Sequence, residues 1–180
     1  MKSGVNKHGI QFEKLKPWIS SIILLPLIYY LIKNDGRILL VDYINLLIHE
    51  GGHGIFKIFG KFIYALGGTL AQILIPGMFV VFYIIKRNKI PAQISLIWLG
   101  QNLINISIYA SDARAQMLPL LGGKKVYHDW NYLLRETGLL NYDNEVGLFF
   151  YSLAILTFIF SILLPLLLKN YKPAKINLDL

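Results

Sequence analysis

The sequence predicts an all-α fold: a polytopic membrane protein with about five transmembrane helices and one short interfacial helix. Its 180 residues are 55% hydrophobic and only 16% charged, which is more apolar surface than a soluble domain of this size can bury. Three long segments contain no Asp, Glu, Lys or Arg, namely 62–85, 90–111 and 146–168. As helices rising ~1.5 Å per residue, each can cross a hydrocarbon core about 30 Å thick.

Two less uniform segments complete the predicted set of spans. Residues 18–32 are uncharged but short, and residues 38–59 are apolar apart from Asp42, Lys57 and a histidine-containing motif. The basic segment 1–17 precedes the first apolar run, which ends without a small-residue cleavage site. We therefore expect the first helix to be retained and its basic leader to favour a cytoplasmic N-terminus.

The spans form one predicted membrane-embedded domain, 18–168, which a polar tail, 169–180, follows. The only sizeable polar connection covers residues 112–145, and we expect an interfacial helix around 129–137 within it. The second and fourth spans run in the same direction, because one span separates them. Their C-terminal halves, the start of the third span and this connection are therefore expected at one membrane face.

The net charge of +8 has its explanation in lipid headgroups rather than in nucleic acid. Lys and Arg gather at span ends, as in KRNK (86–89) and KNYKPAK (169–175), where they meet headgroups and water. We expect the lipid bilayer as a partner and no nucleic acid. The compact, Lys- and Ile-rich chain indicates a multi-pass protein of a bacterial cell membrane. With no cysteine, the chain has no thiolate available as metal ligand or nucleophile.

A HEGGH motif at residues 49–53 places two histidines and a glutamate inside the second predicted span. Positions four apart lie on one face of a helix, so His49 and His53 can ligate one Zn²⁺ ion. Glu50 lies beside them, where it can accept a proton from a water bound to the metal. Three ionisable groups are costly in hydrocarbon, and no nearby Lys or Arg at helical spacing neutralises Glu50. A functional site is therefore favoured over a chance motif.

Polar side chains form a stripe along the second span and another along the fourth. The stripes consist, at spacings of three and four, of Asp42, Asn45, His49 and His53, and of Asn102, Asn105, Tyr109 and Asp112. Two such stripes are expected to face each other or a water-filled cleft. We expect Asn45, Asn105 and Tyr109 to contact substrate or to support the metal ligands. For the fourth span alone, hydrogen bonds to a neighbouring helix are a plausible explanation, but the two stripes together favour a shared site.

A zinc ion held by two histidines usually takes a third protein ligand, and the sequence offers two candidates at the same membrane level. Asp112 ends the polar stripe of the fourth span. His128 begins the sequence HDW, in which Asp129 can cap the following helix and Trp130 can anchor it at the interface. A lone histidine is more often structural than ligating. The residues alone leave Asp112 and His128 as competing third ligands.

Three glycines, Gly51, Gly52 and Gly54, lie within or directly after the motif. Each costs about 1 kcal/mol in a helix relative to alanine, so their presence needs a reason. Close packing of a neighbouring helix is one reason, and close approach of a substrate backbone is another. For the glycines of GGT (67–69), at the start of the third span, packing is the favoured explanation.

At these residues the chain resembles the site-2 protease family of intramembrane zinc metallopeptidases. HEGGH matches the family's HExxH motif on a membrane helix. The resemblance implies that His49 and His53 are zinc ligands and that Glu50 is the catalytic base. It covers spans two to four, roughly residues 40–122.

The family's second motif is an asparagine followed further along by an Asp-Gly pair, whose aspartate is the third ligand. NISIYASDAR (105–114) is similar, and it implies that role for Asp112. Ala113 stands where the family has glycine, and the prolines of that segment are missing. HDW indicates a distinct branch in which His128 joins or replaces Asp112.

The leading hypothesis from the sequence is an intramembrane zinc metallopeptidase that cleaves a membrane-protein substrate. One alternative is a zinc-dependent membrane hydrolase that acts on a lipid amide or ester with the same activated water. Another is a non-catalytic membrane assembly factor. The intact Glu50 argues against this last alternative, because a purely structural zinc site has no use for the glutamate.

Overall fold

A computed structural model of the protein describes residues 15–119 and 127–168, and these residues form helices, turns and connecting segments without β-strands. The all-α prediction is therefore confirmed for this part of the chain. The α-helices are α2 (Ile19–Lys33), α3 (Leu39–Phe56), α4 (Lys61–Ile85), α5 (Lys89–Ser111), α6 (Asp129–Glu136) and α7 (Asp143–Leu167). Three short 3-10 helices precede α2, α4 and α7, at Lys16–Trp18, Lys57–Phe59 and Leu140–Tyr142.

Three helical segments of the described chain are long and apolar enough to cross a membrane. They are Lys16–Lys33, Lys61–Ile85 and Leu140–Leu167. The long helices α3 and α5 coincide with the other two predicted spans but are less apolar, because they carry the two polar stripes. Length and composition thus identify α2, α4 and α7 as candidate spans.

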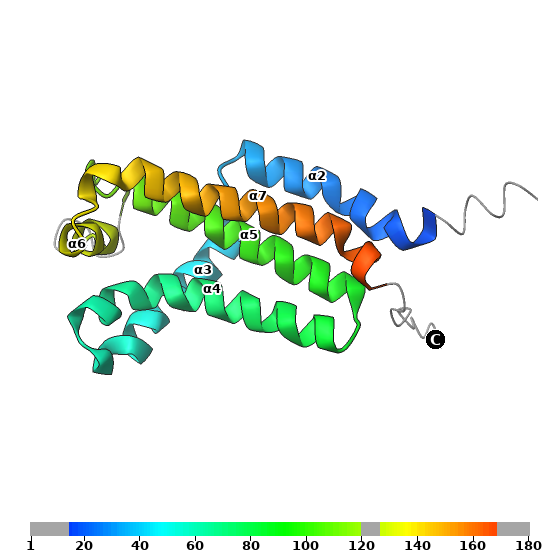
Figure 1. Ribbon diagram of the computed structural model, residues 1–180, viewed down its shortest axis with the longest axis horizontal. Coiled ribbons are helices and arrows are strands. Elements are labelled where there is room, and N and C mark those ends of the chain that lie inside the picture. Colours follow the sequence, from blue (N-terminus) through cyan, green and yellow to red (C-terminus); the bar gives the residue numbers. More distant parts are fainter. Residues whose placement is uncertain (1–14, 120–126, 169–180) are drawn as a thin grey trace, which may run out of the picture.

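Helix α5 lies at the centre of the bundle, with α4 on one side and α7 on the other, and α2 packs on α7 and α5 (Figure 1). More than half of the 23 residues of α5 are buried, including Gln93, Gln101 and Asn102. These amides lie against other helices, where they find hydrogen-bond partners. The moderate hydropathy of α5 therefore reflects amide side chains that face neighbouring helices at the centre of the bundle, not contact with water.

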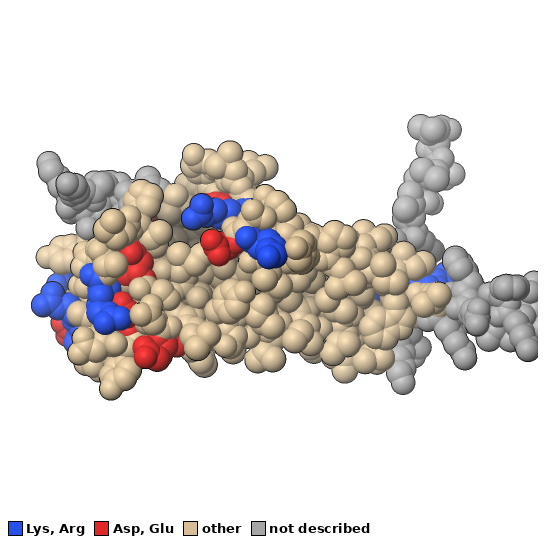
Figure 2. Space-filling view, turned by 90° about the horizontal axis from the view of Figure 1, so that it is seen from above, with Lys and Arg blue, Asp and Glu red and all other residues tan. Residues whose placement is uncertain are grey.

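The outer surface of the bundle is apolar over much of its length. Charged side chains gather at one end and in a smaller group near the middle, and most of the rest of the face shown carries none (Figure 2). Many large hydrophobic side chains of the described residues are exposed, among them Ile23 at 68% exposure and Leu156 at 61%. Patches of this kind are rare on soluble monomers and are typical of surfaces that meet lipid or another protein.

Helix α6 closes one end of the bundle, where it contacts the start of α4 and the end of α5 (Figure 1). Its residues Trp130, Leu133 and Leu134 are buried in a cluster with small residues of α5 and α4. A salt bridge of 2.6 Å between Arg114 and the buried Asp143 ties the end of α5 to the start of α7. Together these contacts hold α6 at a defined place over α3 and α4.

Close backbone packing joins α3 to α4. A Cβ atom added at Gly52 would collide with the carbonyl oxygen of Gly67, and one added at Gly68 would lie 2.5 Å from the His49 ring. These glycines therefore let the motif helix approach α4 and make room for an imidazole. By contrast, Gly51 and Gly54 have open space around them within the described structure.

Candidate metal centre

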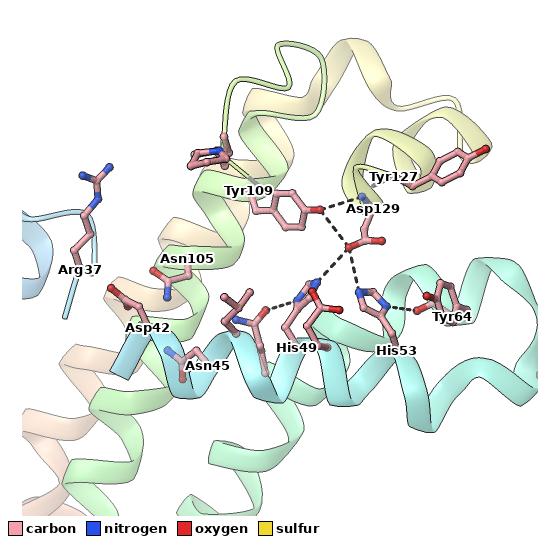
Figure 3. A pocket seen from close by; sticks show the side chains of 15 residues that line it. Arg37, Asp42, Asn45, His49, His53, Tyr64, Asn105, Tyr109, Tyr127 and Asp129 are labelled. Carbon is pink, nitrogen blue, oxygen red and sulfur yellow. Dashed lines mark hydrogen bonds and ion pairs between the residues drawn. The ribbon is translucent and has the colours of Figure 1, made fainter. Parts of the chain in front are cut away.

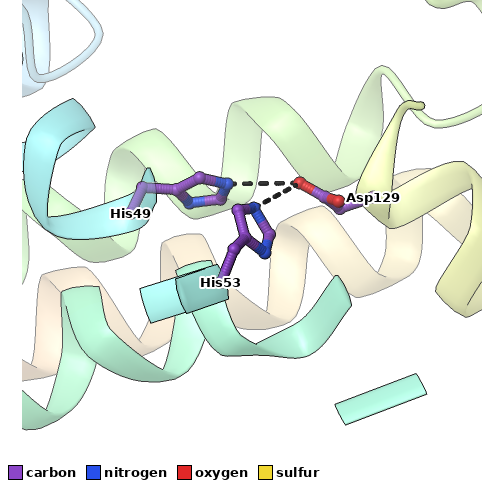
Figure 4. A group of neighbouring side chains, drawn as sticks. All are labelled: His49, His53 and Asp129. Atoms are coloured by element: carbon purple, nitrogen blue, oxygen red, sulfur yellow. Dashed lines mark hydrogen bonds and ion pairs between the residues drawn. The ribbon is translucent and has the colours of Figure 1, made fainter. Parts of the chain in front are cut away.

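Three side chains that commonly bind metals converge between α3 and α6. The Nε2 atoms of His49 and His53 lie 3.2 and 3.3 Å from one oxygen of Asp129 (Figure 4). The ligand atoms of all three residues lie within 4.8 Å of one another. The side chains are 10–12% exposed, so the group is largely shielded from solvent but still accessible.

The two imidazoles converge because His49 and His53 lie one turn apart on α3. Their ring centroids are 4.7 Å apart with nearly perpendicular planes. Asp129 comes from a distant part of the chain, at the first position of α6. Helix periodicity therefore provides two members of the group, and the docking of α6 provides the third.

Hydrogen bonds at Nδ1 orient both rings. His53 Nδ1 donates to the backbone carbonyl of Tyr64 at 2.7 Å, and His49 Nδ1 lies 2.9 Å from Oε1 of Gln72. A carbonyl oxygen can only accept, so the proton of the neutral His53 ring resides on Nδ1. The contact between His49 Nδ1 and Gln72 orients the other ring in the same way, so the Nε2 lone pairs of both rings point toward Asp129. Metal-bound histidines are commonly oriented by a hydrogen bond at their other ring nitrogen.

This geometry fits a bound cation. With both imidazoles neutral and protonated on Nδ1, the two Nε2 atoms and the carboxylate oxygen are all acceptors, so one cation bound among them would satisfy all three groups. Two ligand atoms each ~2.0–2.1 Å from a tetrahedral zinc ion lie about 3.3–3.4 Å apart. The observed separations of 3.2 and 3.3 Å match that spacing closely. The residues present therefore fit a zinc ion.

The carboxyl group of Asp129 is ionised at neutral pH. Burial acts to raise its pKa, but the neighbouring His49 and His53 side chains outweigh burial and lower the pKa to about 2. Asp129 thus keeps a negative charge in a largely enclosed place. A divalent cation compensates that charge better than protons on the two rings, because it satisfies all three groups at once.

Tyr109 holds Asp129 in position. Its hydroxyl accepts a hydrogen bond from the backbone N–H of Asp129 at 3.1 Å and donates one to the carboxylate at 3.2 Å (Figure 3). The ring of Tyr109 also contacts His49, with centroids 5.9 Å apart. The structure thus brings one residue of the second polar stripe to the candidate metal centre.

The two third ligands that the sequence suggested lie elsewhere in the described structure, bonded to each other. Nε2 of His128 lies 3.3 Å from Asp112, and Nδ1 of His128 accepts a hydrogen bond from the Asn131 N–H and so caps α6. Asp112 also accepts hydrogen bonds from the backbone N–H groups of Met117 and Leu118, both at 2.9 Å. This pair therefore supports the segment that delivers Asp129, the acidic side chain that lies beside the two imidazoles.

Asp129 is the residue that sequence reasoning missed. The HDW sequence suggested that Asp129 caps α6, because aspartate is a good N-cap residue. In the structure His128 caps the helix, with an extended backbone at φ −81° and ψ 106°, and Asp129 belongs to the first turn. Because the N-cap is His128, one residue earlier than expected, the carboxylate of Asp129 does not cap the helix and can contact the two imidazoles. The useful signal was an acidic residue next to a histidine in the only long polar connection.

A cavity of about 930 Å³ opens beside the candidate metal centre (Figure 3). Its wall includes His49, His53, Asp129 and Tyr109, together with Glu50 and Asn105. The side chains of Glu50 and Asn105 make no hydrogen bond or ion pair with any residue that the structure describes. Both are thus available to a bound molecule.

Asn45, which the sequence suggested as a substrate-contacting or supporting residue, is bonded to a neighbouring helix. It lines the same cavity but is only 1% exposed, and it is hydrogen-bonded to Trp98, Gln101 and Asn102 of α5. Asn45 therefore joins α3 to α5, whereas Asn105 faces the cavity with its amide unpaired among the described residues.

No protein-family model, no curated protein and no solved structure matches this chain. The chemical meaning of the site therefore rests on its own geometry. Two imidazoles and a carboxylate around one point, with a glutamate and an open cavity beside them, form a donor set suited to activating water.

Proposed function

We propose that the protein is an intramembrane zinc metallopeptidase that hydrolyses a peptide bond of a membrane protein. The observation that carries the proposal is the convergence of His49, His53 and Asp129 on one point beside a cavity that Glu50 also lines. The resemblance of HEGGH to the motif of the site-2 protease family supports a peptide as the substrate.

In this proposal His49, His53 and Asp129 would hold the zinc ion. Three protein ligands are typical of catalytic rather than structural zinc sites. Zinc held there would supply a Lewis acid and a water whose pKa is near 7. Tyr109 keeps the carboxylate of Asp129 in place while the substrate binds.

Glu50 is the proposed general base. It lies next to His49 in the motif, lines the cavity and has no competing partner among the described residues. Its carboxylate accepts a proton from the attacking water, whose oxygen adds to the substrate carbonyl carbon. Glu50 then donates that proton to the leaving nitrogen as the carbon–nitrogen bond breaks.

Binding of the substrate requires an extended backbone. A peptide bond within a helix is shielded, and unwinding it in the membrane leaves its N–H and C=O groups without partners. Asn105 has an amide free to pair with such a segment, and the cavity has room for it. The open space beside Gly51 and Gly54 adds an unobstructed approach along α3.

We further propose that the five long helices all cross the bilayer of a bacterial cell, with α6 at its interface. The composition of α2, α4 and α7 supports spanning directly. For α3 and α5 the support is indirect, because their polar side chains bond across the bundle and not toward its apolar outer face. The candidate metal centre then lies near one membrane face, where water can reach it.

The test uses the whole chain purified in detergent and reconstituted in liposomes with single-span transmembrane peptides. Wild-type protein is expected to contain one zinc ion per chain and to cleave such a peptide, with fragments identified by mass spectrometry. Glu50→Gln is expected to retain zinc and to lose cleavage, and His49→Ala is expected to lose both. Glu136→Gln, which alters an exposed glutamate at the end of α6, is the matched control.

Two results would contradict the proposal. Undiminished cleavage by Glu50→Gln would remove Glu50 from the chemistry. Release of fatty acid from liposome lipids, without cleavage of any peptide, would instead indicate the lipid-directed hydrolase.

A further inference from the structure

Buried amide side chains connect the candidate metal centre to the middle of the bundle. Starting at the cavity, hydrogen bonds run from His49 of α3 to Gln72 of α4, then to Asn102 of α5 and back to Asn45 of α3. The three amides are at most 7% exposed. We call this set, Asn45, Gln72 and Asn102, the amide relay.

At Asn45, the end of the relay away from His49, the hydrogen-bond donors and acceptors are fixed. The indole N–H of Trp98 can only donate, and it donates to Oδ1 of Asn45 at 2.8 Å. The amide nitrogen of Asn45 must then face Gln101, to whose Oε1 it donates at 2.6 Å. Gln101 in turn donates to Asp42 at 2.7 Å and to the carbonyl of Gly36 at 3.0 Å, and both of these only accept. Donors and acceptors are therefore matched on both sides of Asn45.

The donors and acceptors at Asn45 determine those of Asn102 and Gln72, and so of the His49 imidazole. The amide nitrogen of Asn102 donates to Oδ1 of Asn45 at 3.2 Å and to the Trp98 carbonyl at 3.0 Å, so its oxygen faces Gln72. The amide nitrogen of Gln72 donates to that oxygen at 3.2 Å, which turns Oε1 of Gln72 toward His49. Nδ1 of His49 lies 2.9 Å from this acceptor and must carry the proton.

We infer that the amide relay is a positioning device that holds the neutral His49 ring as its Nδ1–H tautomer and so presents the Nε2 lone pair for metal binding. Free imidazole side chains favour the opposite tautomer, with the proton on Nε2, in which that atom cannot ligate. His53 needs no relay, because the Tyr64 carbonyl alone determines its tautomer. The inference rests on the metal site of the proposed function but not on any cleavage activity.

The relay explains a buried polar residue that does not line the cavity. Asn102 is completely buried and is hydrogen-bonded to neither imidazole in the described structure, yet its orientation determines that of Gln72. The order of the residues in the relay also predicts the effect of losing each one. Loss of Gln72 removes the acceptor at His49, whereas loss of Asn102 leaves the acceptor free to rotate.

The experiment measures the tautomer and the zinc affinity separately. Long-range proton–nitrogen correlation spectra of the metal-free chain, labelled in its histidines, identify the protonated nitrogen of each neutral ring. The His49 signals are assigned by their absence from His49→Ala. Wild-type protein is expected to show Nδ1–H at His49, and Gln72→Leu and Asn102→Leu are expected to show a mixture or the Nε2–H form.

Zinc affinity is measured by competition with a chelator. Loss of a residue that hydrogen-bonds to a metal ligand typically lowers metal affinity about 10–100-fold. Gln72→Leu is therefore expected to bind zinc about 10–100-fold more weakly than the wild type, and Asn102→Leu about tenfold more weakly. Gln93→Leu is the matched control, because Gln93 is an equally buried amide of α5 bonded to Ser21 and Ser161, away from the site. Its tautomer spectrum and zinc affinity are expected to equal those of the wild type.

An Nε2–H tautomer at His49 in the wild-type metal-free chain would overturn the inference, and this measurement needs no variant to fold. An unchanged tautomer in both Gln72→Leu and Asn102→Leu would overturn it too. A wild-type chain with the Nδ1–H tautomer that binds zinc but cleaves no peptide would refute only the proposed function, so the two failures are distinguishable.

Discussion

Replacing Asp129 by asparagine tests the assignment of the third metal ligand. One oxygen of Asp129 lies 3.2 and 3.3 Å from the two imidazole nitrogens, so it is the group that completes the site. Asparagine keeps the shape and the backbone N–H that bonds to Tyr109, but it removes the negative charge. The variant thus separates ligation from folding of α6.

The expected loss of zinc affinity is at least about 100-fold. Removing a second-shell partner commonly costs 10–100-fold, and a direct ligand in a site only 10–12% exposed must cost no less than the upper value. At about 1.4 kcal/mol per factor of ten, this is about 2.8 kcal/mol of binding free energy. By contrast, Asp112→Asn and His128→Gln act only through the support of α6, and each is expected to lose about tenfold or less.

The assay is chelator competition on purified protein, with helical content and thermal unfolding as controls for folding. Asp112→Asn is the matched comparison, since it makes the same chemical change at the residue that the sequence motif favoured. The reasoning is refuted if Asp112→Asn loses zinc while Asp129→Asn retains wild-type affinity. Equal losses in the two variants, with both chains folded, would also contradict it.

Three further predictions follow from individual contacts. Tyr109→Phe removes the hydroxyl that bonds twice to Asp129, so zinc affinity is expected to fall about tenfold in the same competition assay, and an unchanged affinity would argue against a positioning role. Gly68→Ala places a Cβ 2.5 Å from the His49 ring and is expected to destabilise the fold by about 1–3 kcal/mol and to weaken zinc binding, as thermal unfolding and chelator competition will show. Gly51→Ala, which meets open space, is the control and is expected to be neutral or to stabilise α3 by about 1 kcal/mol. Measured between pH 8 and pH 5, zinc affinity is expected to fall as the pH is lowered, because metal binding by histidine releases protons. Asp129, with its pKa lowered to about 2, stays ionised throughout this range. An affinity independent of pH over that range would contradict ligation by imidazole.

The extents of the helices were predictable from local sequence, because long apolar runs and turn residues are local signals. The interfacial helix expected at 129–137 corresponds to α6, and HEGGH correctly placed His49 and His53 side by side. Helix periodicity alone is sufficient for this, since residues four apart share a face whatever the rest of the fold does. The sequence also indicated that the polar stripe of the fourth span faces the second, and Asn45 and Asn102 are bonded across that boundary.

The third member of the metal site was not predictable in the same way. Its identity depends on where the backbone enters α6, and a shift of one residue exchanges the roles of His128 and Asp129. It also depends on how α6 docks, which the buried cluster of Trp130, Leu133 and Leu134 determines. Contacts between distant segments leave no periodic signal in one sequence.

The hydropathy of single segments has a similar limit. The sequence predicted five spans, but among the described residues only α2, α4 and α7 are long and apolar enough by composition. Hydropathy averages a helix over its whole circumference, whereas α5 is surrounded by other helices and can carry amides that lipid would not tolerate. The ability of α3 and α5 to cross the bilayer therefore depends on the helices around them as well as on their own composition.

Anomalous diffraction at the zinc absorption edge, from crystals of the purified chain, would locate a bound zinc ion. We predict one zinc ion within ~2.0–2.2 Å of Nε2 of His49, Nε2 of His53 and a carboxylate oxygen of Asp129, with a fourth position open to the cavity. An ion bound instead by Asp112 and His128, or zinc-loaded crystals with no anomalous peak between α3 and α6, would contradict it.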